Sequence, residues 1–316
     1  MRIMVTGGAG FIGSHVADAY VNLGHEVAVL DDLSRGRRAN LNPKARFYEG
    51  DIRNRKFVAE SLAEFRPEAL NHHAAQMDVR RGVREPIFDA DVNITGSLNL
   101  LEEAIANKVR HVVYISSAGA AYGEPKTLPV SEDFPVNPIT PYGISKHTVE
   151  HYLFTFRHLY GLSYTVLRYG NVYGPRQNSA GEAGVFAIFC EQILAGAQPV
   201  IYGDGSKTRD YVYVEDVVKA NILALVRGSG EIFNIASQVP STDLQVFTLV
   251  AQLMGRQDLK PRFTAIRAGE IRHIVLDIAK ARKMLGWRPE ASLSEGAERT
   301  VAYFRDLADT GKRAIA

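Results

Sequence analysis

Three glycines near the N-terminus, in the spacing Gly7-x-x-Gly10-x-x-Gly13, constrain the fold of this chain more than its other features do. A short apolar run, Arg2–Thr6, precedes them, and a helical pattern over Gly10–Leu23 follows. Glycine permits a tight turn from strand to helix and lets the backbone approach a pyrophosphate, whose charge the helix N-terminus stabilises. The pattern therefore predicts a Rossmann-type dinucleotide site.

Short apolar runs and helical patterns alternate through the first half of the 316-residue chain. Strands are expected over Arg2–Thr6, Glu26–Leu30, Arg46–Glu49, Ala69–His72, His111–Ser116 and Ser163–Arg168. Helices are expected over Gly10–Leu23, Asn54–Phe65, Asp91–Asn107, Pro141–Tyr160, Val185–Ala195, Val214–Val226, Leu244–Gly255 and Ile278–Leu285. The alternation predicts an α/β fold, a doubly wound parallel sheet of the Rossmann type.

The rhythm of strands and helices loosens after about residue 170. We expect residues 1–170 to form the dinucleotide-binding Rossmann domain, joined by a strand that returns near 230–236. Residues 171–316 are then expected to form mainly a smaller C-terminal α/β domain that binds the substrate. A length of this order accommodates one large or two modest domains.

Charge and composition exclude several classes of protein. The formal net charge is only +2, from 37 basic and 35 acidic residues, which argues against a nucleic-acid-binding protein. The N-terminus lacks the pattern of a signal peptide, and no uncharged run is long enough to span a membrane. The single cysteine, Cys190, cannot form a disulfide framework. A cytoplasmic protein is expected.

Two carboxylates at the end of the second predicted strand indicate which dinucleotide binds. Asp31 stands where an acidic side chain accepts hydrogen bonds from the adenosine ribose, and Asp32 follows it. Two negative charges there would repel a 2′-phosphate, which favours NAD as the cofactor. The nearby Arg35, Arg37 and Arg38 keep NADP as an open alternative.

Eight ordered sequence blocks resemble a known family across nearly the whole chain. They are TGGAGFIGSH (6–15), LDDLS (30–34), GD (50–51), HHAAQ (72–76), SSAGAAYGEP (116–125), PYGISK (141–146), RYGNVYGPRQ (168–177) and GDGSKTRDYVYVEDV (203–217). The chain resembles the extended short-chain dehydrogenase/reductase superfamily and, within it, the NAD-dependent sugar-nucleotide epimerase/dehydratase family. The resemblance implies a nucleotide-sugar substrate that reacts at the bound dinucleotide.

The resemblance also implies a set of cofactor contacts. Asp51 and Ile52 would read the adenine edge, although Asp51 could instead cap the helix Asn54–Phe65. The remaining predicted cofactor contacts, besides the glycines and Asp31 and Asp32, are Phe11, Ile12, Ser34, Gly36, Ala74, Ala75, Gln76, Asn93, Ser116, Tyr142 and Lys146.

Tyr142 and Lys146 are the predicted catalytic pair. They are four residues apart in a helical pattern that begins at Pro141, so both side chains share one helix face. A phenol ordinarily titrates near ~10 and is a poor base at neutral pH. A fixed ammonium and a positive nicotinamide ring would lower its pKa toward the range that general-base catalysis needs.

A third catalytic group, a Ser or Thr hydroxyl on the reacting sugar, is implied by the resemblance but is displaced here. The family usually places it four residues before the tyrosine of the strand-end YG, and that position is Ala118. Ser117 is the expected substitute, with Ser116 or a water as alternatives. Dehydratases and decarboxylases of the family carry an acid next to this position, whereas this chain has Gly119 and Ala120.

Arginines downstream suit a diphosphate, because planar guanidinium groups bind phosphate oxygens well. By the resemblance, the substrate site comprises Ser117, Tyr142, Asn171, Val185, Ile201, Tyr202, Arg209, Arg267 and Glu270. No metal is expected, because His72 and His73 are adjacent on a strand and should face opposite sides. His147 and His151, one helical turn apart, are expected to be a satisfied surface pair, since no third ligand is apparent.

The resulting expectation is NAD-dependent epimerisation at C4 of a nucleotide sugar, UDP-glucose or UDP-galactose or an N-acetyl or uronic relative, through a 4-keto intermediate. One alternative is a nucleotide-sugar oxidoreductase or reductase with exchangeable cofactor. Another, prompted by Ala118, is an NAD-binding protein without catalytic activity. The resemblance further implies a homodimer, formed through the helices Asp91–Asn107 and His147–Tyr160.

Overall fold

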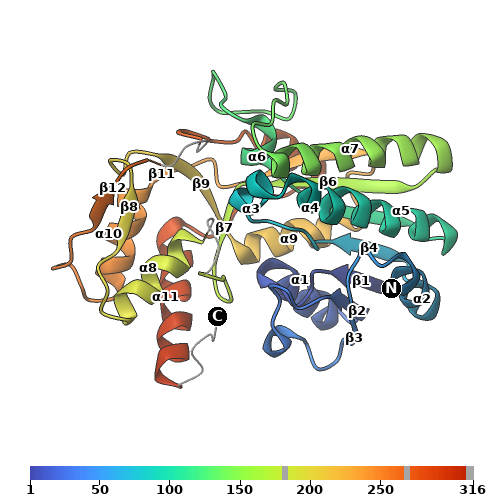
Figure 1. The fold of residues 1–316 in the computed structure, drawn as a ribbon, viewed down its shortest axis with the longest axis horizontal. Coiled ribbons are helices and arrows are strands. Elements are labelled where there is room, and N and C mark those ends of the chain that lie inside the picture. The colour runs from blue at the N-terminus through green and yellow to red at the C-terminus, as the bar shows by residue number, and fades with distance from the viewer. Residues whose placement is uncertain (180–183, 267–270, 311–316) are drawn as a thin grey trace.

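The structure is a computed structural model that describes residues 1–179, 184–266 and 271–310. A seven-stranded sheet forms its centre, in the order β10-β6-β5-β4-β1-β2-β3, and every neighbouring pair is parallel (Figure 1). The strands are β1 (Arg2–Thr6), β2 (Glu26–Asp31), β3 (Arg46–Glu49), β4 (Ala69–His72), β5 (His111–Ser117), β6 (Ser163–Tyr169) and β10 (Glu231–Ile235). The strand order reverses between β1 and β4. In such sheets, ligands bind at the carboxyl ends of the strands at this reversal.

Helices cover both faces of the sheet, which confirms the predicted doubly wound α/β fold. One face carries α2 (Arg55–Phe65), α5 (Gly96–Ala106) and α7 (Pro141–Tyr160), and the other carries α1 (Phe11–Asn22) and α9 (Val214–Ala224). The helix expected over Asp91–Asn107 is instead a π-helical turn, Asp91–Thr95, that continues into α5.

In the described residues after 170, two small sheets form beside the main one, and helices pack against them. β7 (Asn171–Tyr173), β9 (Thr208–Tyr213) and β11 (Pro240–Thr242) form one sheet, and β8 (Val200–Tyr202) pairs with β12 (Arg262–Thr264) in the other. The helices are α8 (Val185–Leu194), α10 (Asp243–Leu253) and α11 (Leu293–Asp309). The sequence analysis missed α11, although its capping box, Ser292 with Glu295, is a readable start signal. The helix expected over Ile278–Leu285 includes a π-helical turn, Ala281–Leu285.

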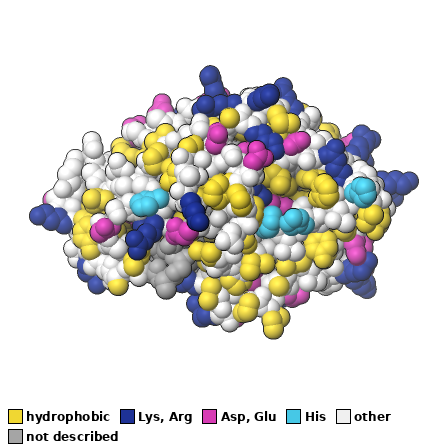
Figure 2. Space-filling view, turned by 90° about the horizontal axis from the view of Figure 1, so that it is seen from above, with side chains coloured by type: hydrophobic (Ala, Val, Ile, Leu, Met, Phe, Trp, Pro, Cys, Tyr) yellow, Lys and Arg dark blue, Asp and Glu magenta, His cyan; other side chains and the backbone are white. Residues whose placement is uncertain are grey.

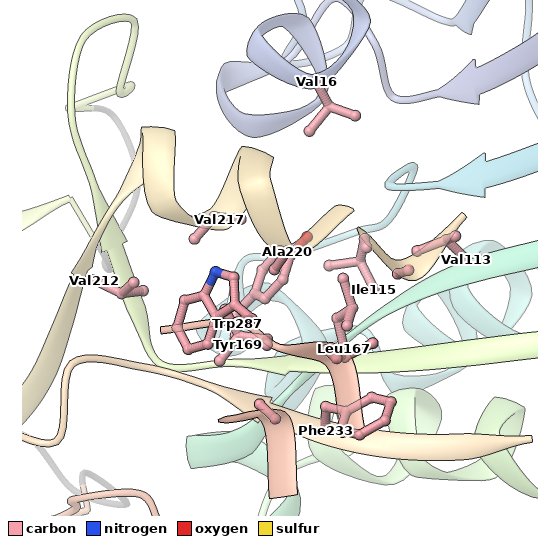
Figure 3. Close-up of a cluster of buried hydrophobic side chains, with 14 of the residues drawn as sticks. Val16, Val113, Ile115, Leu167, Tyr169, Val212, Val217, Ala220, Phe233 and Trp287 are labelled. Atoms are coloured by element: carbon pink, nitrogen blue, oxygen red, sulfur yellow. The ribbon is translucent and has the colours of Figure 1, made fainter. Parts of the chain in front are cut away.

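Residues from both halves of the chain share the main core. Trp287 is only 2 % exposed and packs beside Val217 and Ala220 of α9, facing Tyr169 of the sheet (Figure 3). Its indole N–H donates to the Asp216 carbonyl over 2.8 Å. The C-terminal segment is therefore anchored to the sheet that presents the glycine turn.

Among the described residues, no helix combines the length and the apolar character that a membrane crossing requires.

Candidate active site

The turn between β1 and α1 needs glycine for two separate reasons. Gly7 has a φ of +68°, and a Cβ on it would lie 2.6 Å from the Ala74 backbone nitrogen. A Cβ on Gly13 would lie 2.3 Å from the Gly7 carbonyl oxygen. Helix α1 begins after Gly10, which has no side chain to cap it. The N–H groups of the first turn, including those of Phe11 and Ile12, are therefore not bonded to an N-cap side chain. This cradle fits a pyrophosphate.

Asp31 ends β2 beside this turn and is only 7 % exposed. One of its carboxylate oxygens accepts a hydrogen bond from the Ala9 N–H at 3.0 Å, and the other accepts one from the Leu33 N–H at 2.9 Å. Burial raises the pKa of Asp31, while these backbone donors lower it. A Cβ on Gly36 would lie 2.7 Å from the Asp31 carboxylate, so the loop passes directly over it.

The residues around Asp31 fit an unphosphorylated ribose. Asp32 accepts hydrogen bonds from the Ser34 N–H and hydroxyl, at 2.9 and 2.6 Å, and stays near the predicted site. Two of the arginines that kept NADP as an alternative cofactor are paired with carboxylates. Arg35 lies 3.5 Å from Asp78, and Arg38 is paired with Glu49. These pairings reduce the positive charge available for a 2′-phosphate.

Asp51 does not cap helix α2, so that alternative is wrong. Asn54 is the capping residue, and its side chain accepts a hydrogen bond from the Phe57 N–H. Asp51 instead accepts hydrogen bonds from the Arg53 N–H at 2.8 Å and from its guanidinium. The buried Ile52 beside it contacts the position of Gly96, where a Cβ would lie 2.7 Å from the Ile52 Cδ1.

The loop that follows β4 is held against the glycine turn. The Ala74 N–H donates to the Thr6 hydroxyl over 3.2 Å, and the Gln76 N–H donates to the Asn93 Oδ1 over 2.8 Å. The Asn93 amide returns a hydrogen bond to the Gln76 carbonyl at 2.9 Å. Asn93 is thus near the predicted cofactor, but its side chain serves the backbone of this loop. Ala75 lies between the two pinned residues.

His72 and His73 behave differently at the end of β4. The His72 ring is hydrogen-bonded to the hydroxyls of Thr6 and Ser97, at 2.7 and 2.9 Å. The His73 Nε2 atom is buried and has no hydrogen-bond partner in the described part of the chain. Burial, and then the charge of Lys146, lower the pKa of His73 to about 3. A neutral, unsatisfied ring nitrogen bordering the turn is compatible with a polar ligand there.

Helix α7 presents Tyr142 and Lys146 as predicted, one turn apart at its start. Thr140 caps the helix by accepting the Gly143 N–H, and Pro141 takes the first helical position. A Cβ on Gly143 would lie 2.2 Å from the Ala120 carbonyl, so this end of α7 packs closely on α6 (Ala118–Tyr122). The two side chains are therefore held against the strand end that carries Ser117.

Tyr142 is a neutral phenol in the protein chain alone. Burial, and then the charge of Asp89, raise its pKa to about 12, and a hydrogen bond with the Ser117 side chain partly opposes them. Burial is the largest cause of this shift, and the lowering expected from Lys146 together with the nicotinamide ring stays a prediction. A catalytic phenolate thus needs a further positive charge next to the ring.

Lys146 is 3 % exposed, and its Nζ lies 4.4 Å from the centroid of the Tyr114 ring. Burial lowers its pKa to about 7, while the carboxylates of Glu150 and Asp89 raise it. Glu150 lies one turn further along α7 and is bonded to Arg168 through both carboxylate oxygens, at 3.0 and 2.5 Å. The ammonium is thus stabilised by buried carboxylates.

The three residues at the strand end, 116–118, lie in different environments. The Ser116 hydroxyl donates to Glu150 over 2.6 Å and is 3 % exposed, so it faces the interior. Ala118 is fully buried in the core. Of these three, only Ser117 acts on the pKa of Tyr142, which its side chain lowers. The structure brings together Ser117, Tyr142 and Lys146.

The residues predicted to bind the substrate occupy different environments. Asn171 and Val185 are partly exposed at the starts of β7 and α8. Ile201 of β8 is 1 % exposed and belongs to the C-terminal core, whereas its neighbour Tyr202 is partly exposed. The Arg209 guanidinium on β9 donates to the carbonyls of Thr208 and Arg272, at 3.0 and 3.3 Å. Arg267 and Glu270 lie outside the described residues.

The histidine pair on α7 is satisfied internally, as expected. The His147 and His151 Nε2 atoms are hydrogen-bonded at 3.0 Å, and the His147 Nδ1 bonds Glu150 at the same distance. Within the described ranges, no group of three or more His, Cys, Asp and Glu side chains could hold a metal ion.

Comparisons with known proteins decide the family. The model of the NAD dependent epimerase/dehydratase family matches residues 3–236, a stretch that contains the glycine turn, Asp31, Tyr142 and Lys146. The chain belongs to this family. Its NAD dependence accords with the cradle and with Asp31 at the end of β2.

Relatives in this family match over almost the whole chain. The UDP-glucose 4-epimerase of Mycolicibacterium smegmatis is 46% identical over 312 residues, 97% of this chain and 99% of that one. The crystal structure of the Thermotoga maritima UDP-glucose 4-epimerase with UDP-glucose superposes with a TM-score of 0.95 at 49% identity, covering 97% and 99% of the two chains. The Thermus thermophilus UDP-glucose 4-epimerase in complex with NAD gives a TM-score of 0.92 at 42% identity, covering 96% and 99%.

This family member also carries site residues that the sequence reasoning missed. Glu150 lies four residues after Lys146, so the same helical spacing that linked Tyr142 to Lys146 could have found it. Arg176 has no such signal. Its guanidinium donates to the Ser14 hydroxyl at 3.1 Å and to the Asp18 carboxylate at 2.8 Å, which docks the loop after β7 onto α1.

Gly7→Ala is expected to abolish retention of NAD through desalting. The new methyl would clash with the Ala74 backbone and strain a φ of +68°, so the turn and the loop after β4 must separate. Absorbance of NAD released by denaturation measures retention. Gly24→Ala is the matched control, because Gly24 has a φ of +81° but no atom within 4 Å of its Cβ position. Equal retention in both variants would contradict the proposed turn.

Proposed function

We propose that this protein interconverts UDP-glucose and UDP-galactose by NAD-dependent epimerisation at C4. The observation that carries the proposal is the placement of Tyr142 and Lys146 one turn apart at the start of α7, where this helix packs on α6 directly after Ser117. The near full-length similarity to UDP-glucose 4-epimerases supports the choice of sugar nucleotide.

The chain's own residues would bind the sugar and move one proton. Tyr142 would accept the proton of the sugar 4-hydroxyl, and Ser117 would hold that hydroxyl by a hydrogen bond. Lys146 would hold the nicotinamide ribose and stabilise the phenolate by its charge. NAD, held at the glycine turn and Asp31, would supply the hydride acceptor and donor for C4 of the sugar. The positive nicotinamide ring would also lower the pKa of Tyr142 from about 12.

The small residues beside the catalytic hydroxyl favour epimerisation over elimination. A 4,6-dehydratase needs an acid and a base to move protons at C5 and C6 of the sugar, and this chain has Gly119 and Ala120 at the position that would supply them. A net reductase would need exchangeable cofactor. The paired Arg35 and Arg38 give no support to the NADP that such a reaction favours.

We propose the remaining site assignments on the same footing. The dinucleotide would be held by residues 1–170, and the nucleotide sugar mainly by residues 171–316, with Arg209 and Arg267 toward the diphosphate. Asn171, Val185, Tyr202 and Glu270 would complete the substrate site, with Ile201 as support from the core. A cytoplasmic location accords with the buried, lone Cys190.

We also propose a homodimer formed through α5 and α7. Figure 2 views the molecule from the side of α7 and shows hydrophobic side chains gathered among charged ones. Helix α7 exposes Ile144, Phe154, Leu159 and Tyr160, each more than half exposed. Such a face favours association with a partner. A mass near the 34.9 kDa of one chain in light scattering would contradict the dimer.

The test of the function is a proton NMR assay on purified protein with UDP-, GDP- and dTDP-sugars and no added cofactor. We expect UDP-glucose and UDP-galactose to interconvert, with NAD still bound after desalting. In a parallel assay with cofactor added, net reduction of NAD or net oxidation of NADPH would favour the oxidoreductase alternative. Binding of NAD without conversion of any sugar nucleotide would favour the non-catalytic one.

A further inference from the structure

A fully buried carboxylate lies behind the catalytic helix, at a position to which the sequence analysis assigned no role. Asp89 is on α4 (Pro86–Ala90), a short helix that the sequence analysis did not predict, and its side chain is 0 % exposed. Burying a carboxylate is unfavourable unless hydrogen bonds or charges compensate it. The hydrogen-bond partners of Asp89 must therefore compensate its burial.

The two oxygens of Asp89 connect two elements that are far apart in the sequence. Its Oδ1 accepts a hydrogen bond from the Ser145 hydroxyl at 2.5 Å, and its Oδ2 accepts one from the Gln76 Nε2 at 2.9 Å. Ser145 is on α7, between Tyr142 and Lys146. Gln76 is in the loop after β4, whose Ala74 borders the glycine turn. One carboxylate thus bridges the catalytic helix and the loop beside the predicted dinucleotide.

The surroundings of the bridge leave little freedom to its members. A Cβ on Gly82 of α3 (Val79–Arg84) would lie 2.8 Å from the Asp89 Oδ2, so this helix packs directly on the carboxylate. The Gln76 amide cannot turn over, because its Oε1 accepts the Asp78 N–H at 2.6 Å while its Nε2 also donates to the Asp78 carbonyl at 2.9 Å. The bridge therefore has a defined geometry.

We propose that Asp89 is a positioning residue for the epimerase reaction: it locks α7 to the loop after β4 and places a buried carboxylate against Ser145, between Tyr142 and Lys146 on that helix. The inference rests on the proposed function, because it assigns a role within that active site. Asp89 acts through Ser145 and Gln76 and through its charge, without contacting the reacting atoms.

The charges around the catalytic pair agree with this role. The charge of Asp89 on α4 raises the pKa of Tyr142, Ser117 on β5 lowers it, and the charge of Tyr142 in turn raises the pKa of the buried Tyr114. Lys146 faces Asp89 from α4, Glu150 from its own helix, Tyr114 from β5, and His72 and His73 from β4 and the loop after it. Because both histidines are kept neutral by burial, Asp89 and Glu150 are the carboxylates that favour the ammonium against its burial.

Asp89→Asn separates charge from shape. The asparagine Oδ1 can accept from Gln76 and its Nδ2 can donate to the Ser145 hydroxyl, so both bridging hydrogen bonds survive. Loss of the negative charge lowers the pKa values of both Tyr142 and Lys146. We therefore expect the acid and alkaline limbs of the kcat–pH profile to move together to lower pH, by about one unit. A purely structural defect would lower kcat and leave the limbs in place.

Ser145→Ala provides the second arm, because it breaks the bridge and keeps the charge. We expect kcat to fall about tenfold, with unchanged pH limbs and little change in KM. Asp91→Asn is the matched control, since Asp91 is two residues away but about half exposed and paired with Arg53 at 3.4 Å. It should leave the profile unchanged.

A readout independent of turnover is the titration of Lys146 in the NAD-free chain, followed by NMR of lysine labelled with carbon-13 at Cε and assigned with Lys146→Arg. Wild type should titrate near 7, and Asp89→Asn lower. The proposal would be overturned if Asp89→Asn changed neither the limbs of the kcat–pH profile nor the titration of Lys146. A wild-type kcat in Ser145→Ala would also overturn it. If Asp89→Asn does not fold, kcat in Ser145→Ala decides. If wild type turns over no sugar nucleotide, the proposed function fails, and the titration still tests the charge of Asp89.

Discussion

Tyr142→Phe is expected to lower kcat for UDP-galactose epimerisation about 10³-fold. The variant lacks the hydroxyl that would accept the sugar's proton, and neither Lys146 nor Ser117 can replace it as a base at the same position. The lost hydrogen bond to Ser117 is worth only about 1 kcal/mol, so the fold should persist. Coupled assay of UDP-glucose formation measures kcat, and NAD retention after desalting should equal that of wild type.

Tyr152→Phe is the matched control for this result. Tyr152 is on the same helix, almost three turns further along, and is 38 % exposed with its ring against Phe156. The same hydroxyl is deleted there, away from Ser117 and Lys146, so kcat should stay within twofold of wild type. Wild-type kcat in Tyr142→Phe would remove Tyr142 from the mechanism and leave the NAD-binding role alone.

Glu150→Ala should destabilise the protein by about 3–5 kcal/mol, because it leaves the Arg168 guanidinium buried without its partner. Arg168 and Glu150 are 3 % and 2 % exposed at the side chain. The substitution also removes the acceptor of the Ser116 hydroxyl and a partner of His147. Urea unfolding of the NAD-free protein measures the change. Since the carboxylate supports the Lys146 ammonium, the alkaline limb of activity should also move to lower pH.

The exposed ion pair between Arg299 and Glu215, at 2.7 Å with both side chains over half exposed, supplies the comparison. Glu215→Ala should change the free energy of unfolding by less than about 1 kcal/mol. Equal losses in the two variants would contradict the account of Glu150.

The pH dependence of stability provides a separate check on Glu150. Burial alone would raise the pKa of Glu150, but hydrogen bonds from Arg168 and His147 lower it to about 2. The folded-state pKa is thus below the ordinary 4.5. The stabilisation from Glu150 is therefore complete above pH 4.5 and is lost as the pH falls from 4.5 toward 2. Glu150→Ala should lack this component of acid unfolding.

The fold, the glycine turn and the Tyr142–Lys146 pair were predictable from local sequence patterns. Gly7 and Gly13 are needed where backbone atoms approach within 2.6 Å, and only glycine fits such positions, so they are legible in the sequence. Tyr142 and Lys146 share a helix face by spacing alone. The π-helical turn at Asp91–Thr95 was not predictable, because helical periodicity does not distinguish it from regular helix.

The sequence by itself determined the strand–turn–helix of the dinucleotide cradle, the acidic residue at the end of β2 and the spacing of the catalytic pair, because each depends on residues close together in the chain. Only the tertiary structure decided that Ser116 donates to Glu150 and that Asp89 joins Ser145 to Gln76. Those contacts, and the raised pKa of Tyr142, depend on burial and on groups brought together from distant segments, which a one-dimensional pattern does not encode.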